Sequence, residues 1–110
     1  MRKYNDILFL SAIRKCSTAK YRTGVFFRNR IDIRPVFRYG MECIMGDKEE
    51  SASFLSLRMD NEIRFKSGGS IKFLSMSNNT RGHAFHEVLY AEDIAEESLP
   101  HIQLTEKSYP

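Results

Sequence analysis

Few residues in this sequence have the types and spacing that catalysis requires. Cys16 and Ser17 lie among basic residues, a setting that can lower the pKa of a thiol and make it nucleophilic. Glu87, Glu92 and Asp93 could supply a carboxylate pair for acid–base work, or bind a divalent metal for nuclease chemistry. No second carboxylate cluster accompanies them, and no Gly-x-Ser-x-Gly nucleophile elbow occurs. The sequence therefore favours a protein that acts by binding.

The histidines and cysteines argue against a zinc site. Neither Cys16 nor Cys43 belongs to a Cys-x-x-Cys pair or stands beside a histidine at ligand spacing. His83 and His86 are three residues apart, which suits a helix, but the residues after His83 are typical of the run into a strand, and His101 is isolated. We expect no metal and no cofactor, and we expect both cysteines to be small buried hydrophobic residues.

The strongest binding signal is an uneven distribution of charge. Residues 1–38 carry ten Lys or Arg against two Asp, whereas the remaining residues carry seven against twelve acidic residues. Arginine and lysine neutralise phosphates, and the aromatic residues interleaved with them could stack on bases. We predict contact with nucleic acid or an acidic protein surface; the alternative is a solvated face that contacts the acidic half of the same chain. The residues expected to make this contact are Arg14, Lys15, Lys20, Arg22, Arg28 and Arg30.

The elements that must position these basic residues are predicted from short apolar runs. Residues 7–10 form a run of the kind that makes a buried strand. Residues 11–23 are expected to be a loop that enters a basic helix. Ser17 or Thr18 could cap that helix, and Gly24 could weaken or end it.

The next segment is predicted to contain strands and a loop tip. Residues 25–27 and 31–33 are strand-like, and Pro35 argues against a central strand at that point. Residues 46–51 are the most loop-like part of the chain, so we predict a disordered or mobile tip there.

A β-hairpin is predicted within residues 54–76, where apolar and polar residues alternate on both sides of a Ser-Gly-Gly-Ser turn. A three-residue loop, with Gly69 in the left-handed conformation, places Phe65 opposite Ile71. A two-residue loop would place Phe65 opposite Lys72 instead. Only the three-residue loop keeps the apolar residues on one face, so we predict it.

The C-terminal third is predicted to hold one strand and one helix. Residues 77–82 are a polar connection, and residues 88–90 are a candidate buried strand. Residues 92–99 are expected to form a short helix with acidic residues in its first turn, ended by Pro100. Residues 101–110 show little periodicity.

These elements predict a single small domain of class α/β or α+β, with a mixed sheet, the hairpin near residues 54–76, and two helices. The strand order is left open between a mixed α/β sheet and an antiparallel α+β arrangement. No apolar run approaches the roughly 20 residues of a membrane-spanning helix, so we expect no membrane contact. The N-terminus lacks the apolar region of a secretory signal, which favours a cytoplasmic location.

One longer segment resembles a known family. A Gly69-Ser70 turn is followed by Arg81-Gly82 and then by an apolar strand that leads into Ala91 and Glu92. This order within residues 63–98 resembles the large subunit of tailed-phage terminases, the ATPase motors that package viral DNA. In that family the strand ends in Asp-Glu, the Walker B motif.

A looser part of the resemblance lies upstream. Residues 7–12 are similar to the strand that follows the phosphate-loop helix in those ATPases, with Ala19 and Lys20 in the helix after it. The whole resemblance therefore covers about a third of the chain through clear motifs and about two thirds loosely.

Two departures from the family pattern imply that ATPase activity is absent. No Gly-x-x-x-x-Gly-Lys-Ser/Thr loop occurs to cradle phosphates. Ala91 stands where the family has its magnesium-linked Asp, and Glu92 keeps the place of the catalytic carboxylate. Alternatively, Glu92 and the acidic residues after it are a solvated helix N-terminus.

Three functional hypotheses result. The first is a non-catalytic, phage-derived binding protein that contacts nucleic acid or an acidic partner through its basic N-terminal half, in the host cytoplasm if it is viral. The second is a protein-interaction module, such as an inhibitor of a host enzyme or a virion component, that uses its hairpin edge or an aromatic patch. The third is one part of a split DNA-packaging ATPase whose phosphate loop lies on another chain. The ligand, the partner and the oligomeric state stay open.

Overall fold

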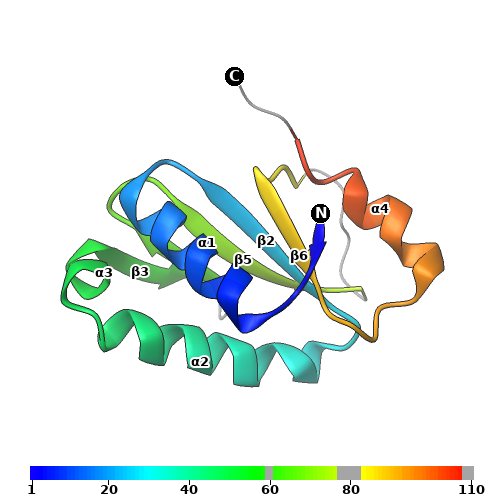
Figure 1. Cartoon of the computed structure of the whole chain (residues 1–110), viewed down its shortest axis with the longest axis horizontal. Helices are drawn as coiled ribbons and strands as arrows, with labels where there is room; N and C mark the ends of the chain where they lie inside the picture. Colours follow the sequence, from blue (N-terminus) through cyan, green and yellow to red (C-terminus); the bar gives the residue numbers. More distant parts are fainter. Residues whose placement is uncertain (59–60, 77–82, 108–110) are drawn as a thin grey trace.

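The computed structural model describes residues 1–58, 61–76 and 83–107 and contains a six-stranded mixed sheet (Figure 1). The strands are β1 (Arg2–Lys3), β2 (Arg22–Phe27), β3 (Phe54–Arg58), β4 (Glu62–Phe65), β5 (Ser70–Ser75) and β6 (Glu87–Tyr90). Their order across the sheet is β1-β6-β2-β5-β4-β3, in which the first four are parallel and β4 runs antiparallel to both its neighbours. This confirms the predicted fold class and decides for the mixed α/β arrangement.

Four α-helices accompany the sheet in the described residues, two more than the sequence predicted. They are α1 (Asp6–Thr18), α2 (Ile33–Met45), α3 (Lys48–Ser53) and α4 (Leu99–Gln103), and the short 3₁₀ turns η1 (Arg30–Asp32) and η2 (Glu96–Ser98) precede α2 and α4. In Figure 1, α3 and α4 lie at opposite ends of the molecule.

The predicted strand over residues 7–10 is wrong, because these residues belong to α1. The Asn5 side chain accepts a hydrogen bond from the Leu8 backbone N–H at 2.8 Å and so caps the helix. Only Phe9 in this apolar run is buried, while Ile7 is 80% exposed. The buried positions recur every three or four residues, which is the helical period. They are Phe9, Ala12, Ile13, Cys16 and Ser17.

The loop and helix start predicted over residues 11–23 are also wrong. Ser17 and Thr18 end α1 instead of starting a helix, and both hydroxyls donate to the Arg14 carbonyl oxygen, at 3.0 and 2.8 Å. Gly24 lies within β2. Residues 25–27 are confirmed as strand.

Residues 31–33 enter η1 and α2 instead of a strand. Pro35 is accommodated in the first turn of α2, where its missing N–H costs no helical hydrogen bond. The loop predicted over residues 46–51 is mostly α3. Asp47 caps α3 by accepting from the Glu50 N–H at 2.9 Å, and Glu50 is buried.

The predicted hairpin is confirmed as β4 and β5, with its loop one residue earlier than expected. The Phe65 N–H donates to the Gly69 carbonyl at 3.0 Å, which closes a three-residue loop, and Gly68 has the positive φ of 89° that was expected at Gly69. Ile63 therefore faces Ile71, and the predicted pairing of Phe65 with Ile71 is wrong. Moving the loop by one residue shifts the register by two, so the same apolar residues remain on the buried face.

The C-terminal region holds one confirmed strand and one misplaced helix. Residues 88–90 are confirmed as part of β6. The helix predicted over residues 92–99 is wrong: a turn and η2 occupy that stretch, and α4 follows. Pro100 stands in the first turn of α4, where proline is well tolerated, instead of ending the preceding helix. The connection predicted at 77–82, which includes Arg81-Gly82, lies outside the described residues.

Two apolar layers hold the sheet between its helices. On one face, residues of β2, β4, β5 and β6 pack against α1 and α2; on the other, Phe26, Leu74 and Val88 pack against Ile94 and Ile102. Parallel strands covered on both faces are typical of α/β proteins. The polar candidates for function therefore lie at the two ends of the strands and on the outer surfaces of the helices.

Candidate nucleic-acid interface

The structure separates the six predicted basic residues into two groups at opposite ends of β2. Lys20 and Arg22 lie where β2 begins, whereas Arg28 and Arg30 follow its last residue. Six strand residues span about 20 Å. Arg14 and Lys15, in the last turns of α1, belong with the first group. The basic N-terminal half is therefore not one contiguous surface.

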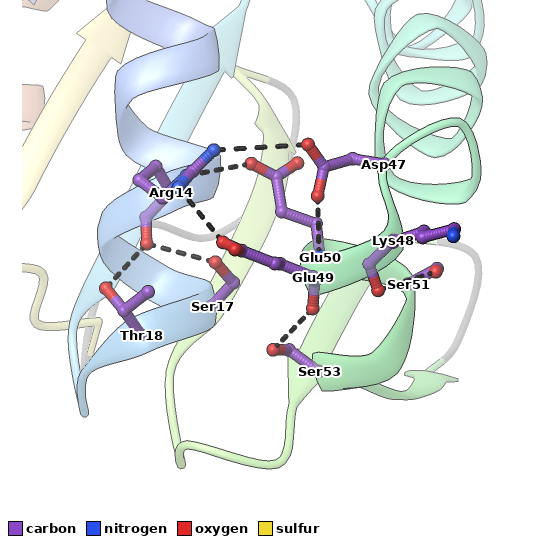
Figure 2. Close-up of polar contacts among 9 residues, drawn as sticks. All are labelled: Arg14, Ser17, Thr18, Asp47, Lys48, Glu49, Glu50, Ser51 and Ser53. Carbon is purple, nitrogen blue, oxygen red and sulfur yellow. Dashed lines mark hydrogen bonds and ion pairs between the residues drawn. The ribbon is translucent and has the colours of Figure 1, made fainter.

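Arg14 is neutralised within the chain (Figure 2). Its guanidinium Nε lies 3.2 Å from Glu50 Oε1, and its other nitrogens lie 3.4 Å from Glu49 Oε2 and 4.0 Å from Asp47 Oδ2. All three carboxylates belong to α3 or to its N-cap. This cluster joins α1 to α3. It agrees with the alternative interpretation of the charge pattern, in which basic residues contact the acidic half of the same chain.

Lys15 also has an intramolecular partner. Its Nζ lies 3.6 Å from Glu87 Oε2 and 5.4 Å from the centre of the Tyr21 ring. Arg2 reaches the same Glu87 oxygen at 3.5 Å. Two cations thus share one buried carboxylate at the start of β6, which offsets about half of their combined charge.

Arg22 packs against an aromatic ring. The central carbon of its guanidinium lies 5.8 Å from the centre of the Phe85 ring, and its backbone N–H donates to His86 Nδ1 at 3.0 Å. Lys20 is exposed and stands in the bend between α1 and β2.

A different group of arginines emerges at the other end of β2. Arg30, Arg34 and Arg38 are spaced four residues apart along η1 and α2, and we call these three the arginine row. Residues four apart on an α-helix, such as Arg34 and Arg38, share one face about 6 Å apart along the axis, and Arg30 borders the same hollow as Arg34. Arg28 precedes the row, and all four side chains are exposed. Arg34 and Arg38 were not among the predicted contact residues, although their spacing of four was visible in the sequence.

The arginine row has no acidic partner in the part of the chain that the structure describes. All ion pairs found among residues 1–58, 61–76 and 83–107 involve Arg2, Arg14, Lys15, Arg64 or the N-terminal amine. Glu42, one turn beyond Arg38, is not within ion-pair distance of it. The row and Arg28 therefore present unneutralised guanidinium groups to solvent.

Two hollows flank the arginine row. One has a volume of about 460 Å³ and lies between α2 and the residues Leu57 and Asn61; the other has about 510 Å³ and lies along the outer face of α2. Arg34 borders both. The first is lined by Arg30, Ile33, Arg34, Phe37, Leu57 and Asn61, and the second by Ile31, Arg34, Pro35, Arg38, Tyr39 and Glu42.

The region expected from the ATPase resemblance is arranged differently from a nucleotide site. Only Tyr4 and Asn5 separate β1 from α1, and the Asn5 side chain already accepts from one of the N-terminal N–H groups of the helix, that of Leu8. Ala91 and Glu92 follow β6, and Glu92 is exposed in a turn. No group of three or more His, Cys, Asp or Glu side chains is placed to hold a metal ion within the described ranges.

The Cys16 thiol is not an activated nucleophile. Its side chain is fully buried, and this burial raises the pKa of the thiol to about 12. The sulfur lies 3.3 Å from the Ser70 carbonyl oxygen, to which the thiol donates. Cys16 is a buried hydrophobic residue as predicted, whereas Cys43 is half-buried.

Comparison with known proteins gives no match to a family model, to a curated protein or to a solved structure. Among the described residues, no helix combines the length and the apolar character needed to cross a membrane.

Proposed function

We propose that this protein binds the phosphate backbone of nucleic acid through Arg28 and the arginine row, without catalysing a reaction. The observation that carries the proposal is the contrast in partners. Arg14 and Lys15 are occupied by carboxylates of the same chain, whereas the four arginines after β2 are exposed and have none in the described residues.

The chemistry of the row suits phosphate. A guanidinium donates two parallel hydrogen bonds to an anionic oxygen pair and keeps its charge at any physiological pH. A row with a repeat of about 6 Å can follow successive phosphates of one strand, and each contact releases condensed counterions. Aromatic and aliphatic side chains beside the arginines add surface for bases and sugars.

The resemblance to phage terminases enters this proposal as a hypothesis of origin only. It is supported by the β4–β5 hairpin and by the buried strand β6, which leads into Ala91 and Glu92. A phage-derived chain of this kind would contact nucleic acid without hydrolysing nucleotide. The genes that flank its own would test this origin, since packaging or virion genes are expected there.

The binding proposal is tested with the full chain and a fluorescent oligonucleotide, by measuring anisotropy over a series of salt concentrations. We expect affinity to fall steeply with salt. In Arg34→Ala/Arg38→Ala, the slope of log affinity against log salt should decrease by about 1.4 for a single strand, because two phosphate contacts are lost.

The matched control is Lys20→Ala/Lys48→Ala, which removes the same charge from exposed positions outside the row. We expect this control to keep most of the salt slope. Binding that does not depend on salt, or an equal loss in both double variants, would contradict the assignment of the row.

A further inference from the structure

The hollow between α2 and the side chains of Leu57 and Asn61 combines cationic walls with an apolar lining. Arg30 and Arg34 border it, and no carboxylate is among the described residues that line it. Ile33, which is buried, and Phe37 supply apolar lining from α2. The neighbouring 510 Å³ hollow also has arginines but includes Glu42, whose charge would repel a phosphate. The charge of the first hollow therefore suits an anionic ligand with an apolar part.

The aromatic part of this hollow is held in place by the core. The Phe37 ring packs edge-on against Phe73, with ring centres 5.4 Å apart and planes at 70°. Phe73 is fully buried in β5. A ring fixed in this way offers apolar contact at little cost in conformational entropy.

The opposite wall offers both apolar surface and hydrogen bonding. Leu57 of β3 is 48% exposed, although it lines the hollow. Asn61 is anchored through its backbone, because its carbonyl oxygen accepts from the Phe73 N–H at 2.7 Å. Its side-chain amide has both a donor and an acceptor, which is the combination that reads the edge of a base.

From these observations we infer that the hollow takes one unpaired nucleobase, and that the protein therefore binds single-stranded nucleic acid in preference to a duplex. This inference rests on the proposed function, since the arginine row must hold the phosphates on either side of the base. In a duplex the bases are stacked and paired inside the helix, so none can enter the hollow without being unstacked. A single strand offers its bases freely.

The inference is tested by comparing four fluorescent probes of equal length on the full chain: oligothymidylate, oligouridylate, an abasic strand and a duplex. The abasic strand has the same phosphates without bases. We expect oligothymidylate to bind about five- to 150-fold more tightly than the abasic strand, which is the usual effect of one stacked base. The oligouridylate arm distinguishes RNA from DNA as the source of the base.

Two variants locate the base. Leu57→Ser and Asn61→Ala change surface positions of the hollow, and each should weaken oligothymidylate binding while leaving the abasic strand unaffected. Arg34→Ala should weaken both probes. The matched control is Leu55→Ser on the same strand, because Leu55 is 57% exposed but lines a different hollow. The control should bind like the wild type.

The outcomes separate the two proposals. Equal, salt-dependent binding of the abasic and base-containing strands would overturn the base site and leave the phosphate contact standing. Tighter binding of the duplex, or a base preference that survives both hollow variants, would overturn the base site as well. If none of the probes binds, the proposed function itself fails.

Discussion

The end of α1 and the arginine row carry similar charge, but they differ in what surrounds that charge. At the end of α1, Arg14 meets carboxylates of α3, and Lys15 meets Glu87. Along α2 the arginines face solvent, and no acidic side chain of the described residues forms an ion pair with them. Charge counted along a sequence therefore overstates the surface available to a partner, because the chain neutralises part of it when it folds.

The largest expected effect tests whether the end of α1 packs closely against the hairpin turn. A Cβ at Gly69 would come within 2.1 Å of the Cys16 carbonyl oxygen, and Ser67 already bridges the two segments by donating to that oxygen. Gly69→Ala should lower the free energy of unfolding by about 3 kcal/mol, because backbone atoms must move apart. Urea denaturation measures this change.

Gly46→Ala is the control for this variant. Gly46 follows α2, has a φ of −81°, and would place its Cβ 3.2 Å from the Glu42 carbonyl oxygen. Its effect should stay within about 1 kcal/mol. If Gly69→Ala were equally mild, the close packing of the hairpin turn on α1 would be contradicted.

The next prediction tests whether the end of α1 contributes to stability and not to oligonucleotide binding. Arg14→Ala should destabilise the protein by about 1 kcal/mol, because it leaves three neighbouring carboxylates without their common cation. The same variant should bind oligonucleotide like the wild type. Denaturation and anisotropy, measured on the same samples, check both statements.

Arg34→Ala should behave in the opposite way. Its stability should stay within about 0.5 kcal/mol of the wild type, because the side chain is exposed and unpaired in the described residues, while its affinity for oligonucleotide should fall. Similar binding losses in Arg14→Ala and Arg34→Ala would remove the distinction between the two regions.

A smaller effect should appear as a pH dependence of the α1–α3 cluster. Burial and the neighbouring Asp47 raise the pKa of Glu50, and Arg14 only partly opposes this. The folded protein thus holds the Glu50 proton more tightly than the unfolded chain does. The contribution of Glu50 to stability should therefore fall as pH rises from the ordinary glutamate pKa of 4.5 through the raised pKa, and stay level above it.

Glu50→Gln, which is neutral at every pH, gives the reference curve. The wild type should lose stability relative to this variant across that pH window. In an Arg14→Ala background the window should extend to higher pH, because the cation that lowers the Glu50 pKa is gone. Two results would contradict the raised pKa of Glu50: a stability difference between the wild type and Glu50→Gln that is constant with pH, or one that increasingly favours the wild type as pH rises.

The smallest expected effect is an absence of reaction at Cys16. Because burial raises the pKa of this thiol to about 12 and leaves it no exposed surface, native protein treated with iodoacetamide should be alkylated at Cys43 and not at Cys16. Peptide mass spectrometry measures the two sites separately. Cys16 should react after unfolding in urea, and reaction at equal rates in native protein would show that the end of α1 is open.

Local sequence patterns were sufficient to predict the strands of the hairpin. The alternation around residues 63–75 predicted the hairpin, its three-residue loop and the buried face, because a period of two fixes which side chains face the core. They did not fix the loop position, since Gly68 and Gly69 both allow a left-handed conformation. The packing of Gly69 against the end of α1 accounts for the choice.

The N-terminal helix shows why a short apolar run misleads. Residues 7–10 contain four apolar residues in succession, yet only Phe9 enters the core. The wider spacing of Phe9, Ile13 and Cys16, together with the Asn5 cap, carried the helical signal. A run of four residues does not distinguish a buried strand from one turn of an amphipathic helix.

The sequence by itself determined a small domain of α/β or α+β class, its hairpin, and the concentration of basic residues before residue 39. Only the tertiary structure decided which of those residues keep their charge available. Arg14 is paired by α3, some 35 residues further along the chain, whereas Arg34 and Arg38 lie on a helix face with no acidic partner in the described residues. Ion pairing depends on distance in space, and long-range packing sets that distance.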